Sequence, residues 1–255
     1  MRLGLVTYMW GAEWDLPTLL KNCAETGFEG AELRTTHKHG VELSLTTEER
    51  REARKRFEDS PVVFVGPGTA CEYHSPDPAV VVKNIEETKQ FVELSHDLGG
   101  TGVKVRPNGF VKDEPREKTI ERMGKALRVC GEFAEGYGQQ IRVEVHGPGT
   151  QELPVMKAIL EVADHPQVVC CWNSNPGEVV NGSIAQALAQ VSDRLGQTMH
   201  IHDLYDKQYP YLELFRLLKQ QKYDGWMLSE SPPTADPVRV MKYYRMLFDE
   251  LVARA

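Results

Sequence analysis

The sequence predicts a single α/β domain over residues 1–255, folded as a (β/α)8 TIM barrel. Short apolar segments alternate with longer amphipathic segments along the whole chain. Eight such pairs fit into the 255 residues at a spacing of roughly 32 residues, which is typical of a TIM barrel. No linker or low-complexity tract divides the chain, so we expect one domain.

The short apolar segments are predicted to be parallel strands. Each is rich in Val, Ile, Leu or aromatic residues and is followed by Gly, Pro, Asn or Asp. They are residues 2–8, 28–34, 61–67, 102–107, 141–147, 168–173, 198–203 and 226–230. A doubly wound sheet is the alternative, but the Gly-rich phosphate-binding fingerprint of that fold is missing after the first strand.

Helix signals lie between these strands. Residues 16–27 show helical periodicity and end in Gly, and the spacing of Thr46 and Glu49 is that of a capping box. Asp77 and Asp236 each precede a Pro, which pairs an N-cap with the residue preferred at the first helical position. The order of elements is therefore strand then helix throughout.

The composition limits the classes of partner. Charged residues make up 26% and hydrophobic residues 41% of the chain, as in ordinary soluble proteins. The net charge of -7 argues against a protein that binds nucleic acid, because a duplex binder normally carries a basic face. No segment approaches the roughly 18 consecutive apolar residues of a membrane span. The N-terminal segment is expected to be the first strand rather than a signal peptide.

The cysteine pattern favours a reducing, cytoplasmic location. The chain has an odd number of cysteines, and their spacing matches no zinc motif. Two adjacent cysteines lie inside an apolar segment. We expect reduced, mostly buried thiols without a catalytic role. The five cysteines are Cys23, Cys71, Cys130, Cys170 and Cys171.

Polar residues end the predicted strands, and in a TIM barrel the chemistry lies at these carboxyl ends. In strand order they are Tyr8 and Trp10, Glu32 and Arg34, His74, Arg106, Glu144 and His146, Asn173, His200, His202 and Asp203, and Glu230. Ionised carboxylates in apolar strands, such as Glu144 and Glu230, are costly unless a cation or strong donors meet them. We therefore predict one shared site of N and O ligands suited to a hard cation. Unrelated structural roles are the alternative.

These strand ends resemble those of the xylose isomerase-like TIM barrels. The similar features are Glu at the ends of strands five and eight and the sequence HIHD in strand seven. The segments GFEGAELR and VKVRP in strands two and four are similar too. The resemblance spans all eight units and depends on the order of these features. That superfamily contains sugar isomerases, ketose 3-epimerases, inosose-processing enzymes and apurinic-site endonucleases.

The resemblance implies one divalent metal, Mn or Mg rather than Zn, because oxygen-rich ligands with one imidazole suit the harder ions. The implied ligands are Glu144, Asn173, His200 and Glu230. His200 is preferred to His202 because the family pattern is His-x-x-Asp. Strand six of the family usually ends in Asp-x-x-His, whereas this chain has an Asn and a Pro at those positions. A neutral oxygen ligand should hold the metal less tightly than a carboxylate.

The implied function is that of an isomerase or epimerase acting on a keto sugar or cyclic polyol. Glu144 and Glu230 would be the catalytic base and acid on either side of the substrate. Four further residues are predicted to bind the substrate, with packing or capping as the alternative for each. They are Arg106, His146 and His202, which would orient it, and Trp10, which would pack against a sugar face.

Three other functions are alternatives. A lyase or dehydratase acting on an inosose or 3-keto sugar would begin with the same proton abstraction. A non-catalytic sugar-binding protein would have no reason to keep two buried glutamates. An apurinic-site endonuclease would need extra histidines, for which His37, His39 and His74 are the candidates. The strand-six His is missing and the chain is acidic, which argues against it. Nothing in the sequence indicates the oligomeric state.

Overall fold

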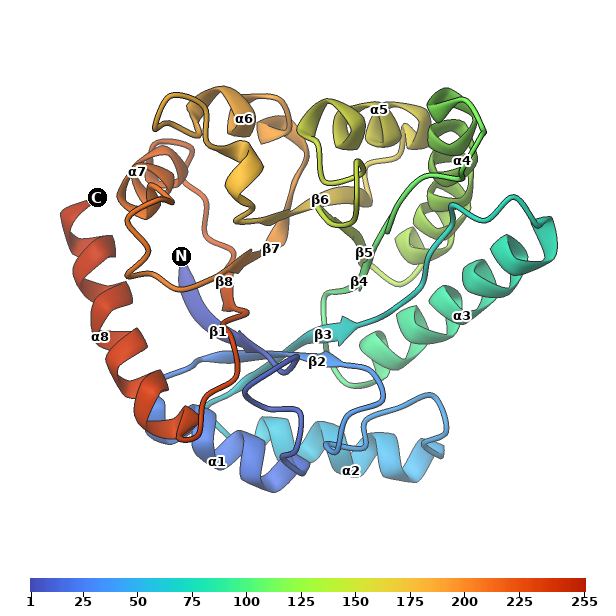
Figure 1. The fold of residues 1–255 in the computed structure, drawn as a ribbon. Coiled ribbons are helices and arrows are strands. Elements are labelled where there is room, and N and C mark those ends of the chain that lie inside the picture. The colour runs from blue at the N-terminus through green and yellow to red at the C-terminus, as the bar shows by residue number, and fades with distance from the viewer.

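The strands of the computed structural model, which describes residues 1–255, close into one barrel. Each strand pairs in parallel with the next along the chain, and β8 returns to pair with β1. The helices form a ring outside the strands (Figure 1). The predicted single-domain TIM barrel is confirmed, because its strand order and parallel pairing are those of that fold.

The strands are short and agree with the predicted segments to within a few residues. They are β1 Arg2–Val6, β2 Gly30–Arg34, β3 Val63–Gly68, β4 Gly102–Val105, β5 Gln140–Glu144, β6 Val168–Asn173, β7 Leu195–Ile201 and β8 Trp226–Ser229. The helices are α1 Leu16–Thr26, α2 Thr47–Glu58, α3 Pro78–Asp97, α4 Arg116–Glu135, α5 Leu153–Ala163, α6 Ala185–Ala189, α7 Tyr211–Gln220 and α8 Pro237–Arg254.

The helix starts follow the local signals in the sequence. The Thr46 side chain accepts a hydrogen bond from the Glu49 backbone, and the Glu49 carboxylate accepts one from the Thr46 backbone, so the capping box forms. Asp77 and Asp236 cap α3 and α8, each ahead of a Pro in the first turn. The connection between β6 and β7 is the least regular, because α6 has only 5 residues and two 3-10 turns flank it.

The interior of the barrel contains buried charged side chains. Arg142 of β5 is fully buried and donates hydrogen bonds to the Val65 carbonyl at 3.1 Å and to the Thr101 hydroxyl at 2.6 Å. Room for its guanidinium comes from Gly102 of β4, where a Cβ would lie 2.8 Å from Arg142 Nε. Glu144 follows two residues later on the same face of β5, so the strand directs two charges into the barrel.

The remaining side chains form a large apolar core. A cluster of 57 buried residues joins the strands to the surrounding helices, and this burial is the main source of stability. All five cysteines are buried and unpaired. No helix of the structure combines the length and apolar character that crossing a membrane requires.

Candidate functional site

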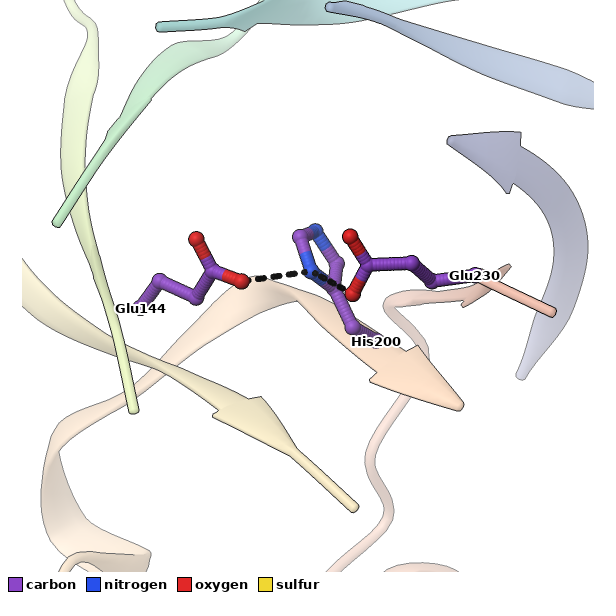
Figure 2. A group of neighbouring side chains, drawn as sticks. All are labelled: Glu144, His200 and Glu230. Carbon is purple, nitrogen blue, oxygen red and sulfur yellow. Dashed lines mark ion pairs between the residues drawn. The ribbon is translucent and has the colours of Figure 1, made fainter. Parts of the chain in front are cut away.

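Three predicted residues converge at the carboxyl ends of the strands. Figure 2 shows Glu144 and Glu230 pointing toward His200 from opposite sides. Nδ1 of His200 lies 3.3 Å from Oε1 of Glu144 and 3.3 Å from Oε2 of Glu230. Glu144 and His200 are buried, whereas the side chain of Glu230 is 18% exposed. One ligand atom from each residue lies within 4.8 Å of the others, as a shared metal would require.

Asn173 completes this group from the neighbouring strand. It pairs in register with His200, which places the two side chains next to each other. Its Nδ2 donates a hydrogen bond to Oε1 of Glu144 at 3.2 Å. Its Oδ1 is buried without a hydrogen-bond partner, as is Nδ1 of His200. Two buried, unpartnered polar atoms at one place indicate that a further group belongs there.

Glu32 of β2 orients the histidine. Nε2 of His200 lies 3.1 Å from Oε1 of Glu32, and both side chains are almost fully buried. A carboxylate can only accept a hydrogen bond, so Nε2 carries the proton of this contact and Nδ1 faces the other two glutamates. This arrangement of a carboxylate behind a histidine is common for metal-binding imidazoles. Burial opposes the imidazolium form, but Cys171, Glu32 and Glu230 outweigh it and raise the pKa of His200 well above its usual value.

Lys104 of β4 brings a positive charge to the same place. Its Nζ lies 2.8 Å from Oε2 of Glu144 and 3.3 Å from the Thr69 carbonyl, and the residue is only 5% exposed. Burial disfavours the charged form of Glu144, but Lys104 and His200 reverse this and hold its pKa well below the usual range. The pKa of Glu230 falls to about 2, since His200 and His202 outweigh the effect of burial. Both glutamates are therefore ionised.

The charges and distances of this group fit a divalent cation. Three carboxylates, from Glu32, Glu144 and Glu230, face the ammonium group of Lys104. This leaves one negative charge while His200 is protonated, and two once His200 has released its proton to become a metal ligand. Divalent ions lie about 2.0–2.2 Å from N and O ligands, so adjacent ligand atoms around one ion are about 3 Å apart. The separations of 3.3 Å around His200 agree with this spacing.

A cavity of about 720 Å³ opens beside Glu230 and Asn173. His146 and His202, two of the predicted substrate-binding residues, lie in its wall. The His202 Nε2 is 3.9 Å from Oε2 of Glu230, and Nδ1 of His146 is buried without a partner. Glu230 and Asn173 also line the cavity, so it leads directly to the group of charged residues.

Trp10 and Arg106 are held elsewhere and do not line this cavity. The Trp10 indole is 5% exposed and donates a hydrogen bond to the Pro232 carbonyl at 2.7 Å. Arg106 forms an ion pair of 2.8 Å with Glu72, in the segment after β3. Trp10 therefore has the packing role that was its alternative, whereas Arg106 forms an ion pair. The contact of either residue with a substrate stays a prediction.

The histidines considered for an endonuclease site do not join the group. His39 contacts the Arg34 carbonyl through Nε2 at 2.8 Å and accepts a hydrogen bond from the Val41 backbone, so both of its ring nitrogens are used locally. Nδ1 of His74 lies 3.8 Å from Glu72. The only set of three potential metal-ligating side chains is Glu144, His200 and Glu230.

Lys104 was missed from the sequence, and Glu32 was recognised only as a polar residue at the end of strand two, without a role in the site. Lys104 and Glu32 both lie inside apolar strands, and the cost of burying a charge, which singled out Glu144, applies equally to them. The residue predicted to enter the site from strand four was instead Arg106, two residues nearer to the predicted strand end. A lysine within GVKV was the available signal.

The chain belongs to the xylose isomerase-like TIM barrel family, because the model of that family matches residues 20–245. No curated protein matches the chain. Among solved structures, D-psicose 3-epimerase from Clostridium cellulolyticum H10 is similar, with a TM-score of 0.81, 15% identity and complete coverage of both chains. The 3-keto-D-glucoside 4-epimerase from E. coli has a TM-score of 0.79 and 16% identity, with 99% of each chain covered. The IolI protein with a bound zinc atom has a TM-score of 0.80 and 16% identity, over 100% of this chain and 99% of that one. At these identities the likeness concerns the fold.

Proposed function

We propose that the protein is a sugar isomerase or epimerase that moves a proton at a carbon next to a carbonyl group. The observation that carries this proposal is the pair of ionised carboxylates, Glu144 and Glu230, on either side of His200, with Glu230 lining an open cavity. Isomerases and epimerases of keto sugars need one group that removes a proton and one that returns it. The similar folds of a psicose 3-epimerase and a 3-keto-glucoside 4-epimerase support the assignment.

The two carboxylates differ in their exposure to the cavity, which indicates a different role for each. Glu230 lines the cavity and is partly exposed, so it can contact a substrate directly. Glu144 is held between Lys104 and Asn173, which keep it ionised and fix its direction. The histidines of the wall, His146 and His202, would donate hydrogen bonds to substrate hydroxyl groups and orient the ring.

The site would hold one divalent metal, Mn or Mg rather than Zn. Glu144, His200 and Glu230 would be its charged and imidazole ligands, and the unpartnered Oδ1 of Asn173 would add a neutral oxygen. When bound, such an ion polarises carbonyl and hydroxyl oxygens and stabilises negative charge on them. A lyase would begin with the same proton abstraction, and no feature of the site favours it. The unpaired cysteines support a cytoplasmic location.

Hydrogen exchange with solvent tests the proposed proton transfer. Glu144→Gln and Glu230→Gln keep the side-chain shape but remove the ability to accept a proton, at a cost of roughly 10²–10⁴ in rate for a general base. Deuterium incorporation from heavy water into a responsive keto sugar should be followed beside product formation. The variant that lacks only the proton-returning group should still exchange substrate hydrogen with solvent, while product formation stops.

Glu29→Gln is a matched control, because Glu29 is an ion-paired glutamate just ahead of β2, at the opposite end of the barrel. Its exchange rate should equal that of the unmodified protein. If both Glu144→Gln and Glu230→Gln also exchange at that rate, neither residue is the base and the proposed function is wrong.

A further inference from the structure

The cavity above Glu230 is acidic, and histidines are the only basic side chains in its wall. Its lining includes Asp203, Asp206 and Glu230 but no Lys or Arg. The two cations on or just after β4 are already used, since Lys104 pairs with Glu144 and Arg106 pairs with Glu72. Phosphate and carboxylate groups are normally recognised by Arg or Lys, and like charges at close range are strongly unfavourable.

The place where TIM barrels often bind phosphate is also closed to an anion. In many of them this place is formed by the loops after strands seven and eight together with a helix N-terminus. Here the loop after β7 carries Asp203 and Asp206, and the loop after β8 carries Pro232 and Pro233, which have no N–H to offer. The N-terminus of α8 is capped by the Asp236 carboxylate, which accepts a hydrogen bond from the Arg239 backbone.

The cavity is also larger than one sugar ring. A hexose takes roughly 200 Å³ at the packing density of a protein interior, whereas the cavity measures about 720 Å³. A ring placed against Glu230 therefore leaves space toward the mouth of the cavity. This space is large enough for a second ring of similar size.

The mouth carries an exposed apolar rim on one side. We define the rim as Tyr8, Met9, Tyr205, Pro232 and Pro233. They follow β1, β7 and β8, and β8 pairs with both of the other two, so these segments are neighbours at the carboxyl end of the barrel. The exposed fractions are 44% for Tyr8, 39% for Met9 and 74% for Tyr205, which leaves much of their surface uncovered. Aromatic rings with a polar tip suit the face of a sugar, which offers C–H groups between its hydroxyls.

We propose that the substrate is an uncharged two-ring sugar, such as a keto disaccharide or a keto glycoside with a cyclic aglycone. The reacting ring lies at Glu144 and Glu230, and the second ring lies against the rim, between Tyr8 and Tyr205. This inference rests on the proposed function for the reacting ring. The choice of a neutral, two-ring substrate depends only on the charge, size and rim of the cavity.

A substrate panel tests the charge and the size separately. Solvent deuterium exchange should be measured for D-fructose, D-fructose 6-phosphate, 3-keto-sucrose and methyl 3-keto-glucoside. The phosphate should lower kcat/KM at least about 100-fold relative to the free ketose, because of the acidic lining. 3-Keto-sucrose should exceed the methyl glycoside about tenfold through its second ring. A phosphate equal to or better than the free sugar, or equal rates for the two keto glucosides, would overturn the inference.

Variants of the rim locate the second ring. Tyr205→Ala should raise KM about tenfold for 3-keto-sucrose and leave methyl 3-keto-glucoside unchanged, whereas Tyr205→Phe should retain the normal KM for both. Tyr243→Ala is the matched control, since Tyr243 is 60% exposed on α8 and does not line the cavity. An equal effect of Tyr205→Ala on both substrates would remove the rim from recognition.

Direct binding separates failure of this inference from failure of the proposed function. Calorimetric titration with the same four sugars reports recognition without chemistry. Selective binding of 3-keto-sucrose without exchange in any sugar would support the two-ring site and contradict the isomerase function. Exchange confined to the sugar phosphate would support the isomerase function and contradict the neutral two-ring substrate.

Discussion

Replacement of the buried lysine is the sharpest test of how the site balances its charge. In Lys104→Met the side chain keeps a similar length but loses the ammonium group that lies 2.8 Å from Oε2 of Glu144. Glu144 is nearly fully buried, and it would keep only Asn173 and His200 as partners. Removal of one partner of a buried ion pair costs about 3–5 kcal/mol, because an uncompensated charge remains inside the protein.

This loss of stability corresponds to a lower melting temperature. For a chain of this size, 1 kcal/mol corresponds to about 2–4 °C, so the Tm of the metal-free variant should fall by about 6–20 °C. Loss of Lys104 also raises the negative charge of the site from two to three, which should strengthen the binding of a divalent ion. Because a ligand that binds only the folded state stabilises it, excess manganese should recover more Tm in the variant than in the unmodified protein.

Thermal unfolding followed by circular dichroism, with chelator and with excess manganese, measures both effects. Lys55→Met is the control, since Lys55 forms a 2.6 Å ion pair with Asp59 on an exposed face, where such pairs contribute little to stability. Lys104→Arg should lie between Lys104→Met and the unmodified protein, because the charge remains but the shape changes. The reasoning is refuted if Lys104→Met melts like Lys55→Met, or if manganese shifts the variant and the unmodified protein equally.

Three further predictions follow from the site and its surroundings. Asn173→Asp should tighten manganese binding, because it adds a negative charge beside His200; calorimetry that shows equal or weaker binding would exclude Asn173 as a ligand. Burial raises the pKa of Glu178 from 4.5 to about 8, so the unmodified protein should lose stability as the pH rises through this range, up to about 4–5 kcal/mol at full effect. Glu178→Gln should remove that slope in urea unfolding measured at several pH values, and an unchanged slope would contradict the raised pKa. With a net charge of -7, the protein should not bind duplex DNA at ~150 mM salt; micromolar retention of an abasic-site duplex would favour the endonuclease alternative.

The sequence alone determined the architecture and the centre of the site. The strands and helix starts depend on local signals, namely apolar segments, caps and Pro or Gly positions. These signals locate the elements to within a few residues. In a closed parallel barrel all carboxyl ends of the strands meet at one face, so Glu144, His200 and Glu230 had to come near one another once the strand order was known. This is why their convergence was predictable from a linear pattern.

Only the tertiary structure decided which other polar side chains enter the site. Lys104 lies on β4 and Arg106 directly follows that strand, yet Lys104 contacts Glu144 inside the barrel and Arg106 contacts Glu72 outside the cavity. Trp10 faces Tyr244 of α8, which is far away in the sequence. The direction in which each of these side chains points depends on the nearest opposite charge or apolar surface. Those partners come from distant segments, whose positions are set only by strand register and packing. Local patterns contain no information about that register, so the side-chain partners could not be read from them.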